Sequence, residues 1–176
     1  KDELALKNEF DQTDIGDKDI REIADIDLAG SEFISLHPKQ DSLRFVSSSA
    51  TYNLKEQVIY ANDVRIIRVA DAAVLPSDGN VTILEKAEML PIENAQILAN
   101  TTTKYHVIFN ATAKILGRKN YTAKGDIEYY DELDNSQIIT LQEISVDSTL
   151  QTVGVGEISD SVGFALSPFF DFKGDV

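Results

Sequence analysis

The sequence predicts an all-β domain, and three patterns lead to that prediction. Between residues 50 and 100, apolar pairs such as Val58-Ile59 and Ile66-Ile67 are separated at short, regular intervals by polar or small residues. From about residue 104, single apolar and polar residues alternate over longer stretches, which is the period of a β-strand. Helical spacing of apolar residues occurs only near the N-terminus.

Residues 1–30 are the least β-like part of the chain and hold ten acidic and four basic residues. Ile20, Ile23 and Ile26 follow one another at helical spacing, and Asp17 is placed to cap a helix. We expect an acidic N-terminal arm with a short helix around residues 18–26 and weak order before it. A calcium loop over 11–22 is not predicted, because Ile15 stands where an oxygen ligand is required.

Residues 31–176 are predicted to form the β domain, and its first half is built from short strands. Short strands at close spacing with small residues at the corners are typical of a β-solenoid or jellyroll-like stack. A sandwich also has many short strands. Its hairpins usually carry Asn-Gly or Asp-Gly turns, and only Asp78-Gly79 has that form here. We therefore expect a solenoid-like middle.

The C-terminal half is predicted to be a longer antiparallel sheet with one buried face. Two alternating stretches flank a turn at 117–119, and a third strand follows in "IITLQEISVD". The first predicted inward set is Val107, Phe109, Ala111, Ala113 and Ile115, and the second is Tyr121, Ala123, Gly125, Ile127 and Tyr129.

The last residues alternate as well. Phe170, Phe172 and Val176 are separated by polar residues and Gly174, which predicts a strand over 169–176. We expect the chain to be part of a longer parent chain that continues this strand, and the strand's edge to be exposed in the isolated domain. The net charge of -14 opposes association at low salt, so we expect a mainly monomeric domain.

Composition excludes several classes of partner and site. A net charge of -14 leaves no basic face for nucleic acid. The absence of Cys excludes a disulfide framework, a thiolate metal site and a cysteine nucleophile. No apolar run is long enough to cross a bilayer.

No catalytic, metal-binding or cofactor-binding residues are predicted. His37 and His106 lie in no ligand-type spacing. Asp126 and Glu128 share a strand face and are the best candidates for a glycosidase pair, with the acidic turn over 131–134 beside them. Such pairs arise by chance in a chain with 30 acidic residues. Trp is absent, so sugar stacking would fall to tyrosines, of which the candidates are Tyr105, Tyr121, Tyr129 and Tyr130.

Sequons for N-glycosylation are also present. The four Asn-x-Ser/Thr triplets begin at Asn80, Asn100, Asn110 and Asn120. Threonine-rich strands produce such triplets by chance, and chance is the favoured interpretation.

The stretches "IRVADAAVLPSDG", "ANTTTKYH" and "GRKNYTAKG" resemble a segment of very large uncharacterised proteins of Bacteroidetes over about residues 30–176. The resemblance implies an exported protein of the periplasm or cell envelope and an interior segment of a long chain. It carries no known activity or catalytic residue. In such bacteria, Asp-Ser/Thr followed by an aliphatic residue or Thr resembles an O-glycosylation signal, and the matches are Asp41-Ser42-Leu43, Asp147-Ser148-Thr149 and Asp160-Ser161-Val162.

Ala50-Thr51-Tyr52 and Ala61-Asn62-Asp63-Val64 are similar to the OstA-like repeats of periplasmic lipopolysaccharide-transport proteins. That similarity implies an open jellyroll that shields lipid chains in an apolar groove. The candidate lining residues are Val58, Tyr60, Ile66, Val74, Ile83, Met89 and Ile97. The alternative is that these residues fill a closed core.

We therefore expect a non-enzymatic structural or binding module of a large envelope-associated or secreted bacterial protein, with a glycan or a lipid as the partner classes to consider. An OstA-like lipid-shielding or lipopolysaccharide-shielding domain is the first alternative. A carbohydrate-active β-solenoid enzyme that uses Asp and Glu pairs is the second.

Overall fold

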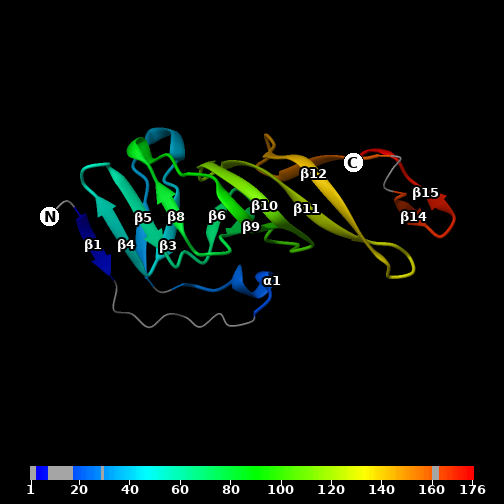
Figure 1. Ribbon diagram of the computed structural model, residues 1–176, viewed down its shortest axis with the longest axis horizontal. Coiled ribbons are helices and arrows are strands. Elements are labelled where there is room, and N and C mark those ends of the chain that lie inside the picture. The colour runs from blue at the N-terminus through cyan, green and yellow to red at the C-terminus, as the bar shows by residue number, and fades with distance from the viewer. Residues whose placement is uncertain (1–2, 8–17, 29, 160–162) are drawn as a thin grey trace.

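The computed structural model describes residues 3–7, 18–28, 30–159 and 163–176, and they form an elongated β protein (Figure 1). A small sheet has the strand order β1-β4-β5-β8, and a large sheet has the order β16-β13-β12-β11-β10-β9-β7-β6-β3-β2. Strands β14 and β15 form a separate hairpin. Every strand pairing among these residues is antiparallel. The all-β prediction is confirmed.

The small sheet comprises β1 (Glu3–Lys7), β4 (Ser49–Asn53), β5 (Val58–Asn62) and β8 (Val81–Ile83). The large sheet comprises β2 (Ser31–Ile34), β3 (Arg44–Ser47), β6 (Ile67–Val69), β7 (Ala72–Leu75), β9 (Ile92–Ala99), β10 (His106–Gly117), β11 (Asn120–Tyr130), β12 (Ser136–Val146), β13 (Thr152–Ile158) and β16 (Gly174–Asp175). The short connections η1 (Pro38–Gln40) and η2 (Glu85–Ala87) are 3-10 turns.

In the N-terminal half the chain passes through both sheets in turn. It crosses from β3 into β4, from β5 into β6 and from β7 into β8, and between crossings it reverses so that each pass pairs with the one before it. The chain crosses a fourth time, from Met89 and Leu90 beside β8 into β9. All four crossings lie on the same side, which we call the seam. The result is a sheet folded over on itself along the seam. No solenoid coil appears among the described residues, because each pass of the chain through the two sheets runs back antiparallel to the pass before it instead of coiling onward.

The C-terminal half is the long antiparallel sheet that the sequence predicts. Strands β9 to β13 pair in chain order, and the tight turn between β10 and β11 falls at the predicted place. The inward set predicted for β11 is also correct, because Tyr121, Ala123, Ile127 and Tyr129 all pack into the main core and Gly125 is buried between them.

The inward set predicted for β10 is correct for Ala111, Ala113 and Ile115 and wrong for Val107 and Phe109. Ile108 is buried in the main core, whereas Val107 packs on the opposite face and Phe109 is only partly covered. The cause is a β-bulge: the register with β11 shifts between Phe109 and Thr112, and Asn110 adopts a left-handed conformation with φ 50°. A bulge adds one residue to a strand, so the alternation reverses on one side of it.

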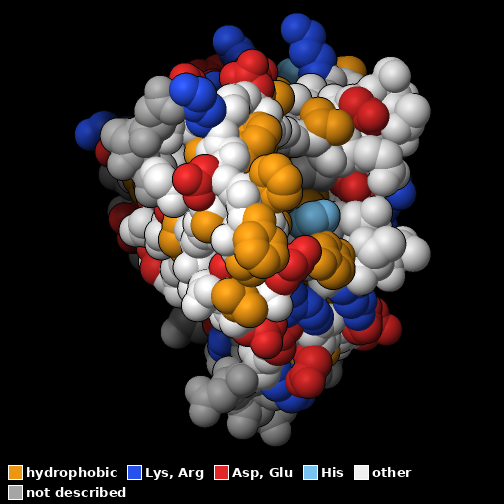
Figure 2. All heavy atoms as spheres, turned by 90° about the vertical axis from the view of Figure 1, so that its right-hand side faces the viewer, with side chains coloured by type: hydrophobic (Ala, Val, Ile, Leu, Met, Phe, Trp, Pro, Cys, Tyr) orange, Lys and Arg blue, Asp and Glu red, His pale blue; other side chains and the backbone are white. Residues whose placement is uncertain are grey.

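The predicted strand over 169–176 is also wrong. Residues Phe170–Asp171 form β15 and pair with β14 (Ala165–Ser167), while β16 pairs with β13. Gly174, the first residue of β16, has a φ of 136°. Strand β16 is the last strand of the large sheet. At the end of the molecule Phe169 is 86% exposed, and Figure 2 shows a band of hydrophobic side chains on this side.

The N-terminal residues differ from the expectation in two respects. Residues 3–7 form an edge strand on β4, which the acidic composition did not predict. The helix α1 spans only Ile20–Ile23, and its cap is Asp19, whose Oδ1 accepts a hydrogen bond from the Arg21 amide at 2.8 Å. The predicted cap Asp17, and most of the arm before it, lie outside the described residues.

Two apolar clusters hold the fold together, one on each face of the large sheet. The main core lies on the face of the large sheet that packs against the small sheet. The second cluster joins Ile20 and Ile23 of α1 to the other face. Strand β7 serves both clusters, because Ala72 and Val74 belong to the main core while Ala73 and Leu75 belong to the second.

We predict that Gly125→Ala lowers the free energy of unfolding by about 1–3 kcal/mol, the usual range for overpacking a core. A Cβ at this position would lie 2.7 Å from Ile108 Cγ2 and 3.0 Å from the Phe109 carbonyl oxygen, at the bulge. Urea unfolding followed by circular dichroism measures the change. Lys124→Ala, on the exposed neighbouring position, is the control and should stay within about 0.5 kcal/mol of wild type. Equal stability of the two variants would contradict the packing described at the bulge.

Candidate functional site

An apolar cavity lies on the side of the folded sheet opposite the seam. Its volume is about 170 Å³. The large sheet contributes Phe33 and Phe45, whose rings stack with centroids 5.3 Å apart. The facing wall comes from the small sheet and the segment after it, through Ile59, Ile83 and Met89. Most of the surface facing the cavity is therefore apolar, with Ser35 and Gln40 as the polar residues that border it.

Gln40 spans the open side of the cavity between η1 and η2. It is a polar residue only 6% exposed. Its side-chain Nε2 donates a hydrogen bond to the Ala87 carbonyl oxygen in η2. Its own carbonyl oxygen accepts from the Arg118 amide at 2.9 Å, in the turn between β10 and β11. Gln40 thus links the two sheets where no crossing strand joins them.

The rim of the cavity is apolar and exposed. Leu36 borders it and is 93% exposed, and Ile34 beside it is also exposed. Exposed apolar side chains next to an apolar cavity are typical of ligand-binding grooves.

The predicted lining residues separate into five groups by location. Ile83 and Met89 line the cavity. Val74 and Ile97 fill the closed main core. Ile66 packs on the α1 side of the large sheet, and Tyr60 points to solvent. Val58 is buried but does not border the cavity. Reasoning from the sequence missed the stacked Phe33–Phe45 pair, although the alternating runs that carry both residues were visible.

The acidic candidates are placed on the outer face of the large sheet. Asp126 accepts hydrogen bonds from Asn110 Nδ2 at 3.1 Å and from Thr140 Oγ1 at 2.8 Å. These contacts tie it to the strands on either side. Glu128 shares its face and lies exposed over a groove beside α1.

The acidic turn is organised by its first residue. Asp131 Oδ1 accepts from the amides of Leu133 and Asn135. Hydrogen bonds from Asn135 hold the pKa of Asp131 below its usual range. Within the described ranges, no group of three or more His, Asp or Glu side chains is arranged to hold a metal ion.

The two histidines make local contacts. His37 caps η1, where its Nδ1 accepts from the Lys39 amide at 3.3 Å. The ring of His106 meets Tyr105 edge-on with centroids 4.9 Å apart.

The modification motifs lie mostly on the surface. Asn80, Asn110 and Asn120 are exposed, and Asn100 is half-buried. Among the Asp-Ser motifs, Ser42 and Ser148 are exposed. Asp160-Ser161-Val162 lies outside the described residues.

A partly buried polar cluster joins the two halves of the molecule. Asp71, in the turn after β6, accepts hydrogen bonds from the Thr152 amide at 3.0 Å and the Thr152 hydroxyl at 2.6 Å. Thr152 Oγ1 lies 2.9 Å from the hydroxyl of Tyr121, whose side chain is fully buried. Burial raises the pKa of Tyr121 to about 12, the Thr152 hydrogen bond acts against that rise, and the Asp71 charge adds to it.

No protein-family model matches the chain, and neither a curated protein nor a solved structure is significantly similar to it. Among the described residues, no helix has the length and apolar character needed to cross a membrane.

We predict that wild-type stability falls between pH 10 and pH 12 by about 2–3 kcal/mol through Tyr121, since one pKa unit corresponds to ~1.4 kcal/mol. The folded chain keeps this proton where the unfolded chain has lost it, so the contribution is complete below pH 10 and lost as pH rises towards 12. Tyr121→Phe should cost about 1 kcal/mol at pH 7, from the lost hydrogen bond.

Ultraviolet titration of the phenols, with urea unfolding at each pH, measures both effects. Tyr121→Phe should remove the latest phenol ionisation, and Tyr105→Phe, which changes an exposed ring, should retain it. The assignment is wrong if Tyr121→Phe retains the late step.

Proposed function

We propose that this chain is a non-enzymatic binding module of a large envelope-associated or secreted bacterial protein, and that the cavity opposite the seam is its binding element. The observation that carries the proposal is an apolar space between two sheets, with an exposed apolar rim. A core that served only stability would close this space, because voids among apolar side chains cost packing energy.

The size of the cavity limits its ligand. Sites for drug-sized molecules usually measure about 300–1,000 Å³, and this cavity is smaller, at about 170 Å³. It has room for part of a flexible apolar chain, not for a rigid multi-ring compound. The end of an acyl chain is the ligand class that fits the volume and the mostly apolar walls.

Lipid shielding of the OstA-like kind is the more specific version of this proposal. It is supported by the way in which the two sheets are connected. The chain crosses between them along the seam, whereas on the other side the contact is made by Gln40 and a few short segments. A longer acyl chain would enter if η1 and η2 moved apart. We also propose that the protein is exported to the periplasm or cell envelope.

The carbohydrate-active alternative has less support. Asp126 accepts hydrogen bonds from Asn110 and Thr140. These bonds connect it to the neighbouring strands, which is typical of a structural residue. Glu128 remains the better candidate of the pair because it is exposed at a groove.

For the cavity, we predict that dodecanoate displaces the fluorescent fatty acid cis-parinarate, which is itself a single hydrocarbon chain, from the wild-type chain. Ile59→Phe should weaken binding of both probes about tenfold or more, because the larger ring fills a space that the ligand needs; tenfold corresponds to about 1.4 kcal/mol. Tyr60→Phe is the matched control on the opposite face of β5 and should bind as wild type does. Absence of binding, or equal binding by both variants, would remove the cavity from the proposal.

For the enzyme alternative, we expect no release of reducing sugar from a panel of plant and microbial polysaccharides. The assay compares wild type with Asp126→Asn and Glu128→Gln. Turnover by wild type that either substitution abolishes would show that the module is an enzyme.

A further inference from the structure

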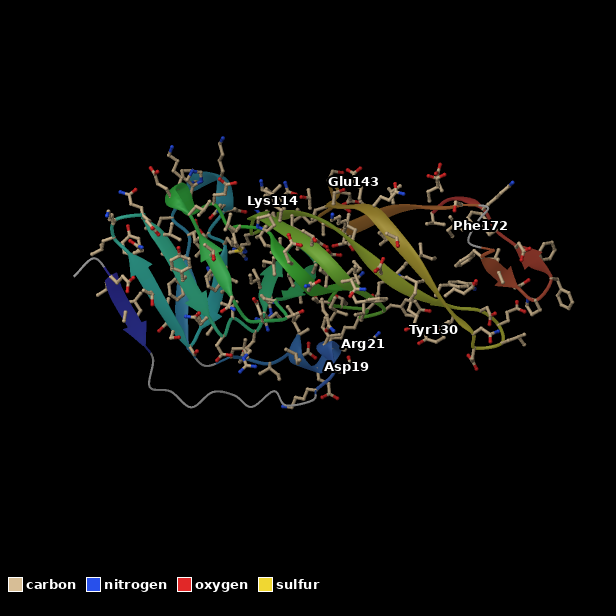
Figure 3. The ribbon with its side chains drawn as sticks, viewed as in Figure 1. Asp19, Arg21, Lys114, Tyr130, Glu143 and Phe172 are labelled. Atoms are coloured by element: carbon tan, nitrogen blue, oxygen red, sulfur yellow. The ribbon has the colours of Figure 1, made fainter. Side chains whose placement is uncertain are left out.

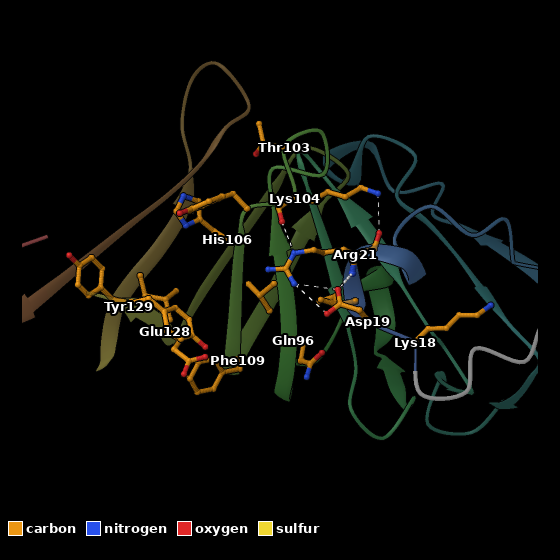
Figure 4. Close-up of a pocket in the computed structure, with 15 residues that line it drawn as sticks. Lys18, Asp19, Arg21, Gln96, Thr103, Lys104, His106, Phe109, Glu128 and Tyr129 are labelled. Atoms are coloured by element: carbon orange, nitrogen blue, oxygen red, sulfur yellow. Dashed lines mark hydrogen bonds and ion pairs between the residues drawn. The ribbon is translucent and has the colours of Figure 1, made fainter. Parts of the chain in front are cut away.

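The outer face of the large sheet carries a second site, separate from the apolar cavity. A groove of about 980 Å³ runs between α1 and the strands β9, β10 and β11. Figure 4 shows Arg21 reaching from α1 towards these strands, with Gln96, Phe109 and Glu128 along the groove. Figure 3 places Tyr130 on the same side of the sheet as Asp19 and Arg21.

Strand register explains which side chains form the groove floor. Phe109 pairs with Asp126, and Ile108 pairs with Ile127, so Val107 lies opposite Glu128 on the outer face. The bulge at Asn110 turns Phe109 to this face, and without it the ring would point into the core. Tyr130 follows Glu128 on the same face, at the end of β11.

The wall of the groove is fixed in place by reciprocal contacts across the sequence. Arg21 Nε donates to the Lys104 carbonyl oxygen at 2.8 Å, and Lys104 Nζ donates to the Arg21 carbonyl oxygen at 3.0 Å. These bonds hold α1 against the loop between β9 and β10. The groove is therefore formed before any ligand arrives, which lowers the entropy lost on binding.

The groove offers flat apolar surfaces beside hydrogen-bonding groups. Tyr105 is 76% exposed and Tyr130 is 57% exposed, and both border the groove. Gln96, His106 and Glu128 border it too. The Tyr130 hydroxyl bonds to the Glu128 carboxylate, which raises the pKa of Tyr130. A tyrosine ring with a polar group beside it suits a ligand that has both an apolar and a hydroxylated surface.

The net charge of the groove is small, because two of its basic residues are paired and the other two charged residues, Lys18 and Glu128, have opposite signs. Arg21 pairs with Asp19 at 3.3 Å, and Lys104 pairs with Asp25. An ionic ligand would have to compete with these partners. A neutral ligand needs only the acceptors and donors that remain at Gln96, His106 and Glu128.

We propose that this groove binds a neutral oligosaccharide. A pyranose ring presents C–H groups on its face and hydroxyls around its edge, so its face fits the Tyr105 and Tyr130 rings and its hydroxyls fit Gln96 and Glu128. The volume lies at the upper end of the range for small-molecule sites, which favours several sugar units over one. This site neither requires nor excludes the acyl ligand of the cavity.

The test uses the whole chain and three neutral probes: maltohexaose, laminarihexaose and mannohexaose. Isothermal titration calorimetry should detect at least one of them with a dissociation constant of about 1 mM or tighter. Tyr105→Ala and Tyr130→Ala should each weaken that binding about threefold to tenfold, the usual value of an aromatic contact. Tyr60→Ala, an exposed tyrosine on the small sheet, is the matched control and should leave it unchanged.

Substitutions of Glu128 provide a second, independent test of oligosaccharide binding. Glu128→Gln keeps an oxygen acceptor and should retain most of the binding, whereas Glu128→Ala should lose it. All these residues are exposed, so circular dichroism should show every variant folded. The proposal is overturned if no probe binds at about 10 mM, if both tyrosine variants bind as wild type does, or if hexagalacturonate binds while the three neutral probes do not.

Discussion

The structure depends on covering both faces of its central strands. Strands β6, β7 and β9 are neighbours in the interior of the large sheet, and β7 is buried along its whole length. The small sheet covers one face, because the chain repeatedly crosses the seam, and α1 covers the other. Such a strand loses its alternation of apolar and polar residues. Both candidate binding sites follow from this arrangement, since the cavity lies under the small sheet and the groove lies beside α1.

The bulge in β10 determines what each face contains. On the loop side of Asn110, Ile108 turns into the core and Phe109 turns outward; beyond it, Ala111 and Ala113 are buried. Gly125 allows the backbone of β11 to pass closely at this point. A regular strand would bury Phe109 and expose Ile108, and the groove would then lose one of its aromatic rings. The one extra residue in this bulge therefore determines that Ile108 packs in the core and that Phe109 lies at the groove.

Much of the fold could be predicted from the sequence, because long alternating runs such as 120–130 specify both a strand and its face. The short helix was predictable from the spacing of Ile20 and Ile23. The crossings at the seam could not be predicted, because a short strand has the same residue pattern whether the chain coils onward or folds back after it. The bulge at Asn110, which reverses the alternation of buried and exposed residues, could not be predicted from the sequence pattern. Only the residue type, Asn, is compatible with it. The groove was the least predictable feature, because it brings residue 21 beside residue 104, although its tyrosines at 105 and 130 were recognisable as sugar-stacking candidates.

The path of the chain also implies an order of folding. Strands β9 to β13 each pair with their neighbour in the sequence, so this meander closes only short loops and can form early. The bond between Arg21 and Lys104 spans 83 residues, and β1 must wait for β4. During synthesis, α1 leaves the ribosome well before the loop that will hold it. The helix α1 and strand β1 are thus made before the strands on which they dock, and until they dock the outer face of β6, β7 and β9 remains open to water.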